Sequence, residues 1–205
     1  LMVDEATKGL AGVSASQVEM TSGIQFYDGI TTAEIQEILI RSASDLIDLD
    51  HPNYQFVAAR LLLFALRKQL YGRIHDVPTV KQHVERCVGR GVYDAEILDL
   101  YSDEEFDKLE SYIDHHRDYL FTYAGLRQVV DKYLVQDRSS GSLYETPQFM
   151  YLLIAATIFS KYPKETRLDY VKKYYDAISR HKINIPTPIM AGVRTPLRQY
   201  ASCVL

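Results

Sequence analysis

Residues 187–205, TPIMAGVRTPLRQYASCVL, carry the features that decide how this chain is organised. Pro188 and Pro196 prevent one continuous helix across the stretch, because proline fixes φ and lacks an N–H. Gly192 permits a backbone geometry that a side chain would forbid. Residues 198–205 are typical of the opening of a β-strand, since Tyr and Val favour extended backbone. The sequence stops inside that strand, so we expect a piece of a longer polypeptide.

The composition is that of an ordinary globular protein. Of the 205 residues, 47% are hydrophobic and 24% are charged, which is ample for a core. The net charge of −4 and the lack of a basic stripe disfavour nucleic acid as a main partner. No apolar run reaches the roughly 18 residues of a membrane-spanning helix, and no signal peptide is visible. Two cysteines argue against a disulfide framework and favour a reducing cytoplasm.

The N-terminal part of the chain is predicted to be a small bundle of short helices. A capping box, Thr31-x-x-Glu34, opens a helix whose apolar spacing continues to Leu49. Another helix is expected over about residues 53–71, where apolar residues share one face. We take residues 1–75 as the first unit.

Residues 76–197 are predicted to form a second helical unit. A second capping box, Ser102-x-x-Glu105, opens one of its helices. Two short runs, at residues 133–136 and 142–145, flank a Gly-containing loop. They predict a long β-hairpin at Tyr133–Glu145. The helical faces that should meet in one bundle-like body are those around Leu61, Leu109 and Val171.

The residues alone offer few candidates for chemistry. Cys203, beside Ser202, could be an exposed redox or nucleophilic thiol, or a buried strand cysteine that packs as a small hydrophobe. Cys87 lies on an apolar helical face and is predicted to pack in a core. His115 and His116 are adjacent, so they cannot share a metal as an i, i+4 pair could. We predict no metal site.

The run T-P-I-M-x-G-V-R-T-P followed by S-C-V-L carries a specific resemblance. It resembles the segment where the large (alpha) subunit of class I, Ia-like, ribonucleotide reductases leaves its N-terminal helical domain and enters its catalytic barrel. The resemblance covers essentially the whole chain. Its upstream stretches are IQFYDGI (24–30), AARLLLFALRK (58–68), KYLVQ (132–136) and YPKETRLDYVKKYYDA (162–177).

The resemblance implies a mainly α fold in three parts. Residues 1–75 would be a truncated ATP cone, a module that binds nucleotide effectors. Residues 76–197 would be the ribonucleotide reductase N-terminal helical domain, with one β-hairpin. Residues 198–205 would be the first strand of the catalytic α/β barrel.

The resemblance also implies roles at the C-terminal stretch. Cys203 matches one of two cysteines that give up electrons and become a disulfide as substrate is reduced. Ser202 and Thr187 would line the pocket for the substrate's diphosphate or ribose. No residue here matches the family's thiyl-radical cysteine, second redox cysteine or catalytic glutamate, so this piece alone is expected to be inactive.

A second site, for effectors, is implied in the N-terminal part. ATP activates and dATP inhibits members of this family. Thr32, at a helix start, and Lys68 match residues that contact the effector, and both suit phosphate. From the residues alone, a plain cap at Thr32 and a solvated Lys68 stay open. Gln36 stands where the family commonly has a histidine, and the module's opening hairpin is missing, so the response to dATP is left open.

The complete enzyme would reduce ribonucleoside diphosphates to deoxyribonucleoside diphosphates by thiyl-radical chemistry, for DNA synthesis. A small subunit would supply the radical from a diiron-tyrosyl or related centre, and thioredoxin or glutaredoxin would re-reduce the cysteine pair. The large subunit is expected to be a cytoplasmic homodimer without a cofactor of its own. The alternative is a stand-alone, non-catalytic helical domain that binds a nucleotide or serves as an adaptor, which nothing in the helices excludes.

Overall fold

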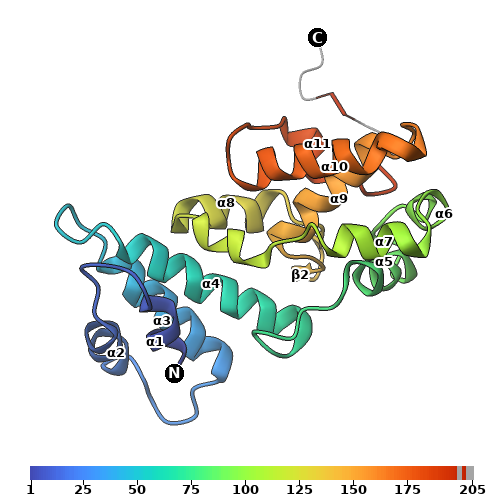
Figure 1. Ribbon diagram of the computed structural model, residues 1–205. Coiled ribbons are helices and arrows are strands. Elements are labelled where there is room, and N and C mark those ends of the chain that lie inside the picture. Colours follow the sequence, from blue (N-terminus) through green and yellow to red (C-terminus); the bar gives the residue numbers. More distant parts are fainter. Residues whose placement is uncertain (198–199, 202–205) are drawn as a thin grey trace. The chain divides into compact units, whose positions relative to one another are not determined.

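The computed structural model describes residues 1–197 and 200–201 and is mainly helical (Figure 1). Its contacts divide the chain into two compact units. Unit 1 consists of residues 1–76 and 118–129, and unit 2 consists of the described residues of 77–117 and from 130 onward. The barrel strand expected at 198–205 falls largely outside the described residues.

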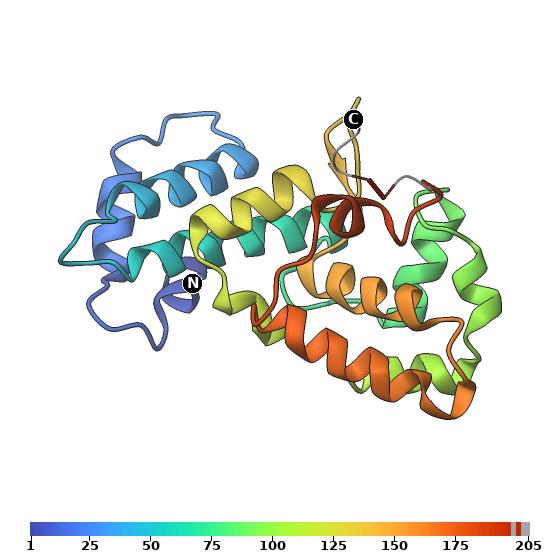
Figure 2. The ribbon, with the colours of Figure 1, turned by 90° about the horizontal axis from the view of Figure 1, so that it is seen from above.

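Unit 1 is built around one long central helix. Its elements are α1 (Met2–Thr7), α2 (Ala15–Gly23), α3 (Thr32–Asp45), α4 (Tyr54–Tyr71), the end of the 3₁₀ helix η1 (His115–Leu120) and most of α8 (Tyr123–Lys132). α3 and α4 lie side by side and antiparallel (Figures 1 and 2). α4 is buried on more than one face because α1 and α3 both pack on it. Its fully buried apolar side chains include Val57, Ala58, Leu61, Leu63 and Phe64.

Two arginines of α4 hold the later segment, residues 118–129, in unit 1. Arg67 Nη2 donates to Asp118 Oδ2 at 3.1 Å, and both side chains are buried. The Arg60 guanidinium carbon lies 4.9 Å from the ring centre of Tyr119. A buried pair such as Arg67–Asp118 is costly to break from one side, because the remaining charge stays buried.

The end of α3 differs from the sequence prediction. The helix ends at Asp45, and Leu49, which was expected on its apolar face, is 99% exposed. The Asp48 carboxylate accepts the N–H groups of Asp50 at 2.9 Å and His51 at 2.6 Å. These local bonds compete with helical hydrogen bonds and stop the helix early.

Unit 2 is organised around an apolar helix. Its helices are α5 (Val80–Gly89), α6 (Glu96–Leu100), α7 (Asp103–Glu110), α9 (Pro147–Phe159), α10 (Lys164–Ser179) and α11 (Thr187–Gly192). α9 is apolar all round, and such a helix has to be enclosed on every side. α10 packs along α9, as Figure 2 shows, and α11 also contacts it.

The hairpin of unit 2 lies where the sequence predicts it but is shorter. β1 (Gln136–Asp137) pairs antiparallel with β2 (Ser142–Leu143), with Gln136 opposite Leu143. Beyond this ladder one more backbone bond joins the two segments, from the Tyr144 N–H to the Val135 carbonyl at 3.0 Å. The N–H of Val135 instead donates to the side chain of Glu145 at 2.7 Å, so a carboxylate replaces the facing backbone carbonyl as its acceptor.

The expectation of one bundle-like body is wrong. Leu61 is buried in the core of unit 1, whereas Leu109 and Val171 are buried in unit 2. The apolar residues of α4 are already enclosed within their own unit. The mainly α fold class is confirmed, and so are both capping boxes, at Thr31 and at Ser102. In the described part of the chain, every helix is too short or too polar to cross a membrane.

Candidate functional site

The C-terminal stretch forms a short helix that begins at a predicted site residue. Thr187 is the first residue of α11 and is exposed. Pro186 precedes it with extended backbone, and Pro188 lies in the first turn, where the missing N–H costs nothing. Ser202 and Cys203, which were expected to lie with Thr187, fall outside the described residues.

Gly192, at the other end of α11, does not use the backbone freedom that glycine permits. Its φ is not positive, and a Cβ added there would meet only the ring of Tyr200, at 3.9 Å. That is an ordinary van der Waals contact, so the backbone at this position would accept a side chain. The helix ends because Thr195 and Pro196 follow, with Thr195 Oγ1 donating to the Gly192 carbonyl at 2.8 Å.

Arg194 anchors the stretch that follows α11. Its Nε donates to Glu145 Oε2 at 2.8 Å, and its Nη2 pairs with the other oxygen of the same carboxylate. Nη1 donates to the Met190 carbonyl at 2.5 Å, and Nη2 also donates to the Tyr133 carbonyl at 3.0 Å. Both charged side chains are buried. A bidentate pair of this kind fixes direction as well as distance.

Two further side chains, Tyr93 and His83, hold the Glu145 carboxylate in place. The hydroxyl of Tyr93 donates to Glu145 Oε2, and it lies 2.9 Å from Nε2 of His83. The imidazole of His83 is fully buried and stacks on Phe149, with ring centres 3.8 Å apart and planes 9° apart. His83 Nδ1 has no hydrogen-bond partner among the described residues.

Burial sets the charge state of this network. It lowers the pKa of His83 well below its usual value, so the imidazole is neutral. Burial and the Glu145 charge raise the pKa of Tyr93 well above its usual value. Burial opposes the charge on Arg194, but Glu145 outweighs it and raises the pKa of that guanidinium. Groups that hold their protonation states so firmly are suited to fixing structure rather than to transferring protons.

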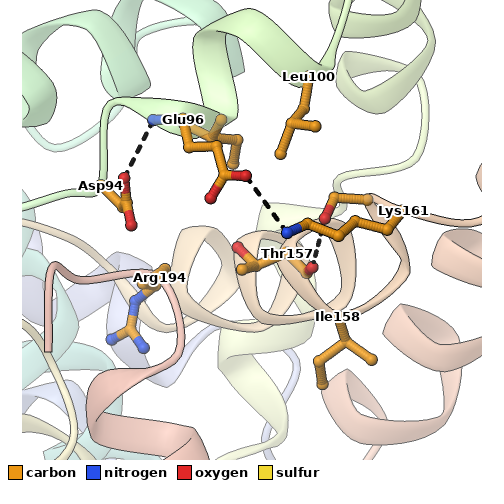
Figure 3. A pocket seen from close by; sticks show the side chains of 9 residues that line it. Asp94, Glu96, Leu100, Thr157, Ile158, Lys161 and Arg194 are labelled. Atoms are coloured by element: carbon orange, nitrogen blue, oxygen red, sulfur yellow. Dashed lines mark hydrogen bonds and ion pairs between the residues drawn. The ribbon is translucent and has the colours of Figure 1, made fainter. Parts of the chain in front are cut away.

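A small pocket of about 150 Å³ lies beside the same arginine, between α6 and α9 (Figure 3). Glu96 and Lys161 approach each other across it, with Glu96 Oε1 3.5 Å from Lys161 Nζ. The Arg194 guanidinium points away from both of them, as Figure 3 shows. Because these two charges neutralise each other, we assign no ligand to this pocket.

The predicted effector residues lie at one end of the α3–α4 pair. Thr32 is the first residue of α3, and Lys68 lies in the last turn of α4, which runs antiparallel to it. The cap itself is Thr31, whose N–H and hydroxyl donate to Glu34 Oε2 at 2.8 Å and 2.7 Å. These bonds lower the pKa of Glu34. Its negative charge at the helix start works against a phosphate there, whereas Lys68 favours one.

Gln36 lies one helical turn beyond Thr32, on the same side of α3. Its amide nitrogen is buried and has no hydrogen-bond acceptor among the described residues. A buried donor without a partner costs free energy, and an acceptor atom on a ligand would remove that cost. The amide therefore fits a role beside a bound nucleotide.

The predicted core position of Cys87 is confirmed. The side chain is 1% exposed, and its thiol lies 3.7 Å from the Tyr144 carbonyl. Burial raises the pKa of the thiol to about 12. In the described part of the chain, no three His, Cys, Asp or Glu side chains come together as a metal site.

Comparisons with known proteins agree with this arrangement. An ATP cone domain model matches residues 5–69, and a model of the ribonucleotide reductase all-alpha domain matches residues 119–198. The chain is 56% identical over 98% of its length to the ribonucleoside-diphosphate reductase subunit alpha of Haemophilus influenzae. It is 53% identical over its whole length to ribonucleoside-diphosphate reductase 1 subunit alpha of Escherichia coli. It is 46% identical over 95% of its length to the ribonucleoside-diphosphate reductase subunit alpha of Enterobacteria phage T4.

The chain belongs to the ribonucleotide reductase large-subunit family.

The match has a limited extent on the relatives' side. The chain spans about a quarter of each of these alpha subunits, 26% of the Haemophilus influenzae protein and 27% of the Escherichia coli protein. The family's two domain models also do not coincide with the two units. The all-alpha domain model begins at residue 119, yet residues 118–129 pack within unit 1.

Sequence reasoning missed the residues that organise the C-terminal stretch of this chain. Arg194 lies inside the quoted G-V-R-T-P motif, and Glu145 directly precedes the Thr146-Pro147 start of α9. Neither position shows its partner in the sequence, because the pair is separated by 49 residues. The one available signal was a charged residue within an apolar motif, which has to be paired when buried.

Proposed function

We propose that this chain is the N-terminal part of the alpha subunit of a ribonucleoside-diphosphate reductase. One observation carries the proposal. Relatives that are 46–56% identical over 95–100% of the chain are named as alpha subunits of that enzyme. Identity at this level over the whole chain extends through both units and the C-terminal stretch.

The proposed reaction converts ribonucleoside diphosphates to deoxyribonucleoside diphosphates. A thiyl radical activates the ribose, the 2′-hydroxyl leaves as water, and two cysteine thiols supply two electrons as they become a disulfide. Cys203 is the proposed redox-active cysteine, and Thr187 and Ser202 bind the substrate. The exposure of Thr187 at the start of α11 supports this assignment. Residues 1–205 alone are expected to be inactive.

The remaining parts of the proposal concern partners. A small subunit supplies the radical from its own diiron-tyrosyl or related centre, and thioredoxin or glutaredoxin reduces the disulfide after each turnover. The alpha subunit acts as a homodimer in the cytoplasm. None of these partners requires a cofactor held by this chain.

The first unit is proposed to bind ATP and dATP as allosteric effectors. The match of residues 5–69 to the ATP cone domain supports this. Thr32 and Lys68 lie at one end of the α3–α4 pair, and the unpartnered amide of Gln36 lies one turn from Thr32. The Glu34 carboxylate, which caps α3, is the group that limits phosphate affinity there.

The test is a substitution of each cysteine in the full-length subunit, assayed with the small subunit and a dithiol reductant. Cys203→Ser should abolish repeated turnover, because serine cannot form the disulfide. Cys87→Ala is the matched control and should keep wild-type turnover, since its thiol is buried in a core. Wild-type turnover by the Cys203→Ser variant would refute the redox assignment.

A further inference from the structure

We propose that Arg194 is a positioning residue for substrate binding. Through its buried pair with Glu145, it fixes α11 and hence the Thr187 hydroxyl at the start of that helix. The inference rests on the proposed function, because Thr187 binds substrate only if that function is correct. Arg194 itself acts through α11 and does not touch the substrate.

The helix α11 is too short to fix its own position. It has six residues, Thr187–Gly192, and a helix of that length is unstable without tertiary contacts. The Arg194 guanidinium donates to the carbonyl of Met190, inside α11, at 2.5 Å. The same guanidinium is bonded to Glu145 and to the carbonyl of Tyr133, which lie elsewhere in unit 2. Arg194 thus ties the helix to the body of its unit.

The Glu145 carboxylate in this pair is held in a single orientation. Glu145 Oε1 accepts the N–H of Val135 at 2.7 Å, and Oε2 accepts the hydroxyl of Tyr93. The Tyr93 hydroxyl is in turn held 2.9 Å from His83, which stacks on α9. Because each oxygen has a neutral donor besides the guanidinium, rotation of the carboxylate would break several bonds at once.

The backbone of Arg194 is held as well as its side chain. Its carbonyl accepts the N–H of Asp94 at 3.0 Å, and the neighbouring Thr195 hydroxyl bonds to Gly192. The end of α11 is therefore fixed from two sides. A helix fixed at its end, with Pro186 and Pro188 restricting φ at its start, presents Thr187 in one direction.

Unit 2 contains a matched comparison. Arg167 is also buried, and it bonds to one carboxylate, Glu105, and to two carbonyls, those of Ser160 and Leu100. It lies on α10 and none of these partners belongs to α11. Replacing Arg167 removes the same kinds of bonds from the same unit without releasing α11.

The experiment compares Arg194→Lys with Arg167→Lys in the full-length subunit, assayed with the small subunit. Lysine keeps the charge but loses the planar bidentate fork. Arg194→Lys should raise KM for the nucleoside diphosphate about tenfold, equivalent to ~1.4 kcal/mol. Its kcat should stay within about twofold, because binding is lost equally in ground and transition states. Arg167→Lys should leave KM unchanged.

A second readout does not depend on activity. Hydrogen exchange of the α11 amides should accelerate in Arg194→Lys, while exchange in α9 should keep its wild-type rate. Tyr93→Phe provides a gentler variant, which keeps the Arg194–Glu145 pair but removes the hydroxyl that holds the carboxylate. It should raise KM in the same direction by a smaller factor.

Three outcomes separate the possibilities. If wild-type protein fails to reduce ribonucleoside diphosphates, the proposed function fails and the inference with it. If the wild type is active and both lysine variants raise KM equally, the effect is general destabilisation and the positioning role is wrong. If Arg194→Lys speeds α11 exchange but leaves KM unchanged, Arg194 fixes a helix that does not bind substrate, which also overturns the inference.

Discussion

The imidazole of His83 gives unit 2 a dependence on pH. Burial lowers its pKa in the folded protein below the ordinary value of 6.5, so the unfolded chain binds the proton more readily. The free energy of unfolding should therefore fall as pH drops from about 7 to about 5. Chemical denaturation followed by circular dichroism at a series of pH values measures this slope.

The control for this prediction is His83→Gln, whose amide keeps a polar partner for Tyr93. The slope should become shallower but not vanish, because burial also lowers the pKa of His181. Hydrogen bonds from Ser139 and Ser140 lower the pKa of Asp137 to about 2, so this carboxylate stays charged throughout this range. An unchanged slope in His83→Gln would contradict the assignment.

The buried thiol of Cys87 should resist alkylation. With a pKa of about 12 and 1% exposure, it offers almost no thiolate to iodoacetamide at pH 8. Mass spectrometry of the native protein should show one modified cysteine, Cys203, and two after denaturation. Modification of Cys87 at the same rate as Cys203 in native protein would show that the core around it opens readily.

At the residue level, the sequence predicted core and capping positions better than it predicted which charged residues pair. Cys87 could be assigned to a core from the apolar residues beside it, and Thr31 and Glu34 from their spacing. The Arg194–Glu145 pair could not be predicted, because its geometry depends on how the hairpin and α11 meet. Long-range pairing of charges is a property of the folded chain, and no local pattern encodes it.

At the scale of elements, the end of α4 shows how backbone geometry determines stability. Gly72 follows the helix with a φ of +77°, and its N–H donates the last hydrogen bond of the helix to the Lys68 carbonyl. Gly72→Ala should destabilise unit 1 by about 1 kcal/mol, because a Cβ disfavours the left-handed region. Since the chain lacks tryptophan, urea denaturation followed by circular dichroism is the suitable measurement.

A glycine in the same unit provides the opposite expectation. Gly23 ends α2 without a positive φ, and an added Cβ would meet nothing within 4 Å. Gly23→Ala should therefore stabilise unit 1 by about 0.4–1 kcal/mol, through a lower entropy of the unfolded chain. If both substitutions shift stability in the same direction, backbone conformation is not the cause.

Helix starts were predicted more accurately than helix ends and strand lengths. The starts depend on side chains close in sequence, as in the Thr31 and Ser102 capping boxes. The early end of α3 depends on Asp48 bonding to the backbone beyond it. At the end of the hairpin, the Glu145 carboxylate takes the N–H of Val135 and pairs with Arg194, and strand propensity does not encode either contact.

At the scale of the whole molecule, the Arg67–Asp118 pair should decide the stability of unit 1. Asp118→Asn leaves a buried guanidinium without its counter-charge and should cost about 3–5 kcal/mol. Hydrogen exchange should rise in α4 of unit 1, while α9 of unit 2 keeps its protection.

The exposed pair Arg73–Asp76 in unit 1 is the matched control, at 3.2 Å against 3.1 Å for the buried pair. Asp76→Asn should cost less than about 1 kcal/mol, because water screens and solvates both charges. If Asp118→Asn also increases hydrogen exchange in α9, the two units unfold together. They would then be distinct in their contacts but not in their stability.

The composition of unit 1 could not be predicted from the sequence. Linear boundaries at residues 75 and 76 were the natural expectation, since each stretch has its own helices and caps. Only the folded chain brings residues 118–129 to α4, through Arg60 and Arg67. The ends of this segment continue directly into residues of unit 2, so its backbone belongs to both parts of the chain.

This discontinuous unit has a consequence for synthesis on the ribosome. A nascent chain that has emerged only as far as residue 76 lacks Asp118, the carboxylate that pairs with Arg67 in the folded unit. At about 5–20 residues per second, residues 77–129 take several seconds to be translated. During that interval the first helices remain an incompletely folded intermediate that chaperones can reach. Unit 1 completes its fold only after part of unit 2 has already been made.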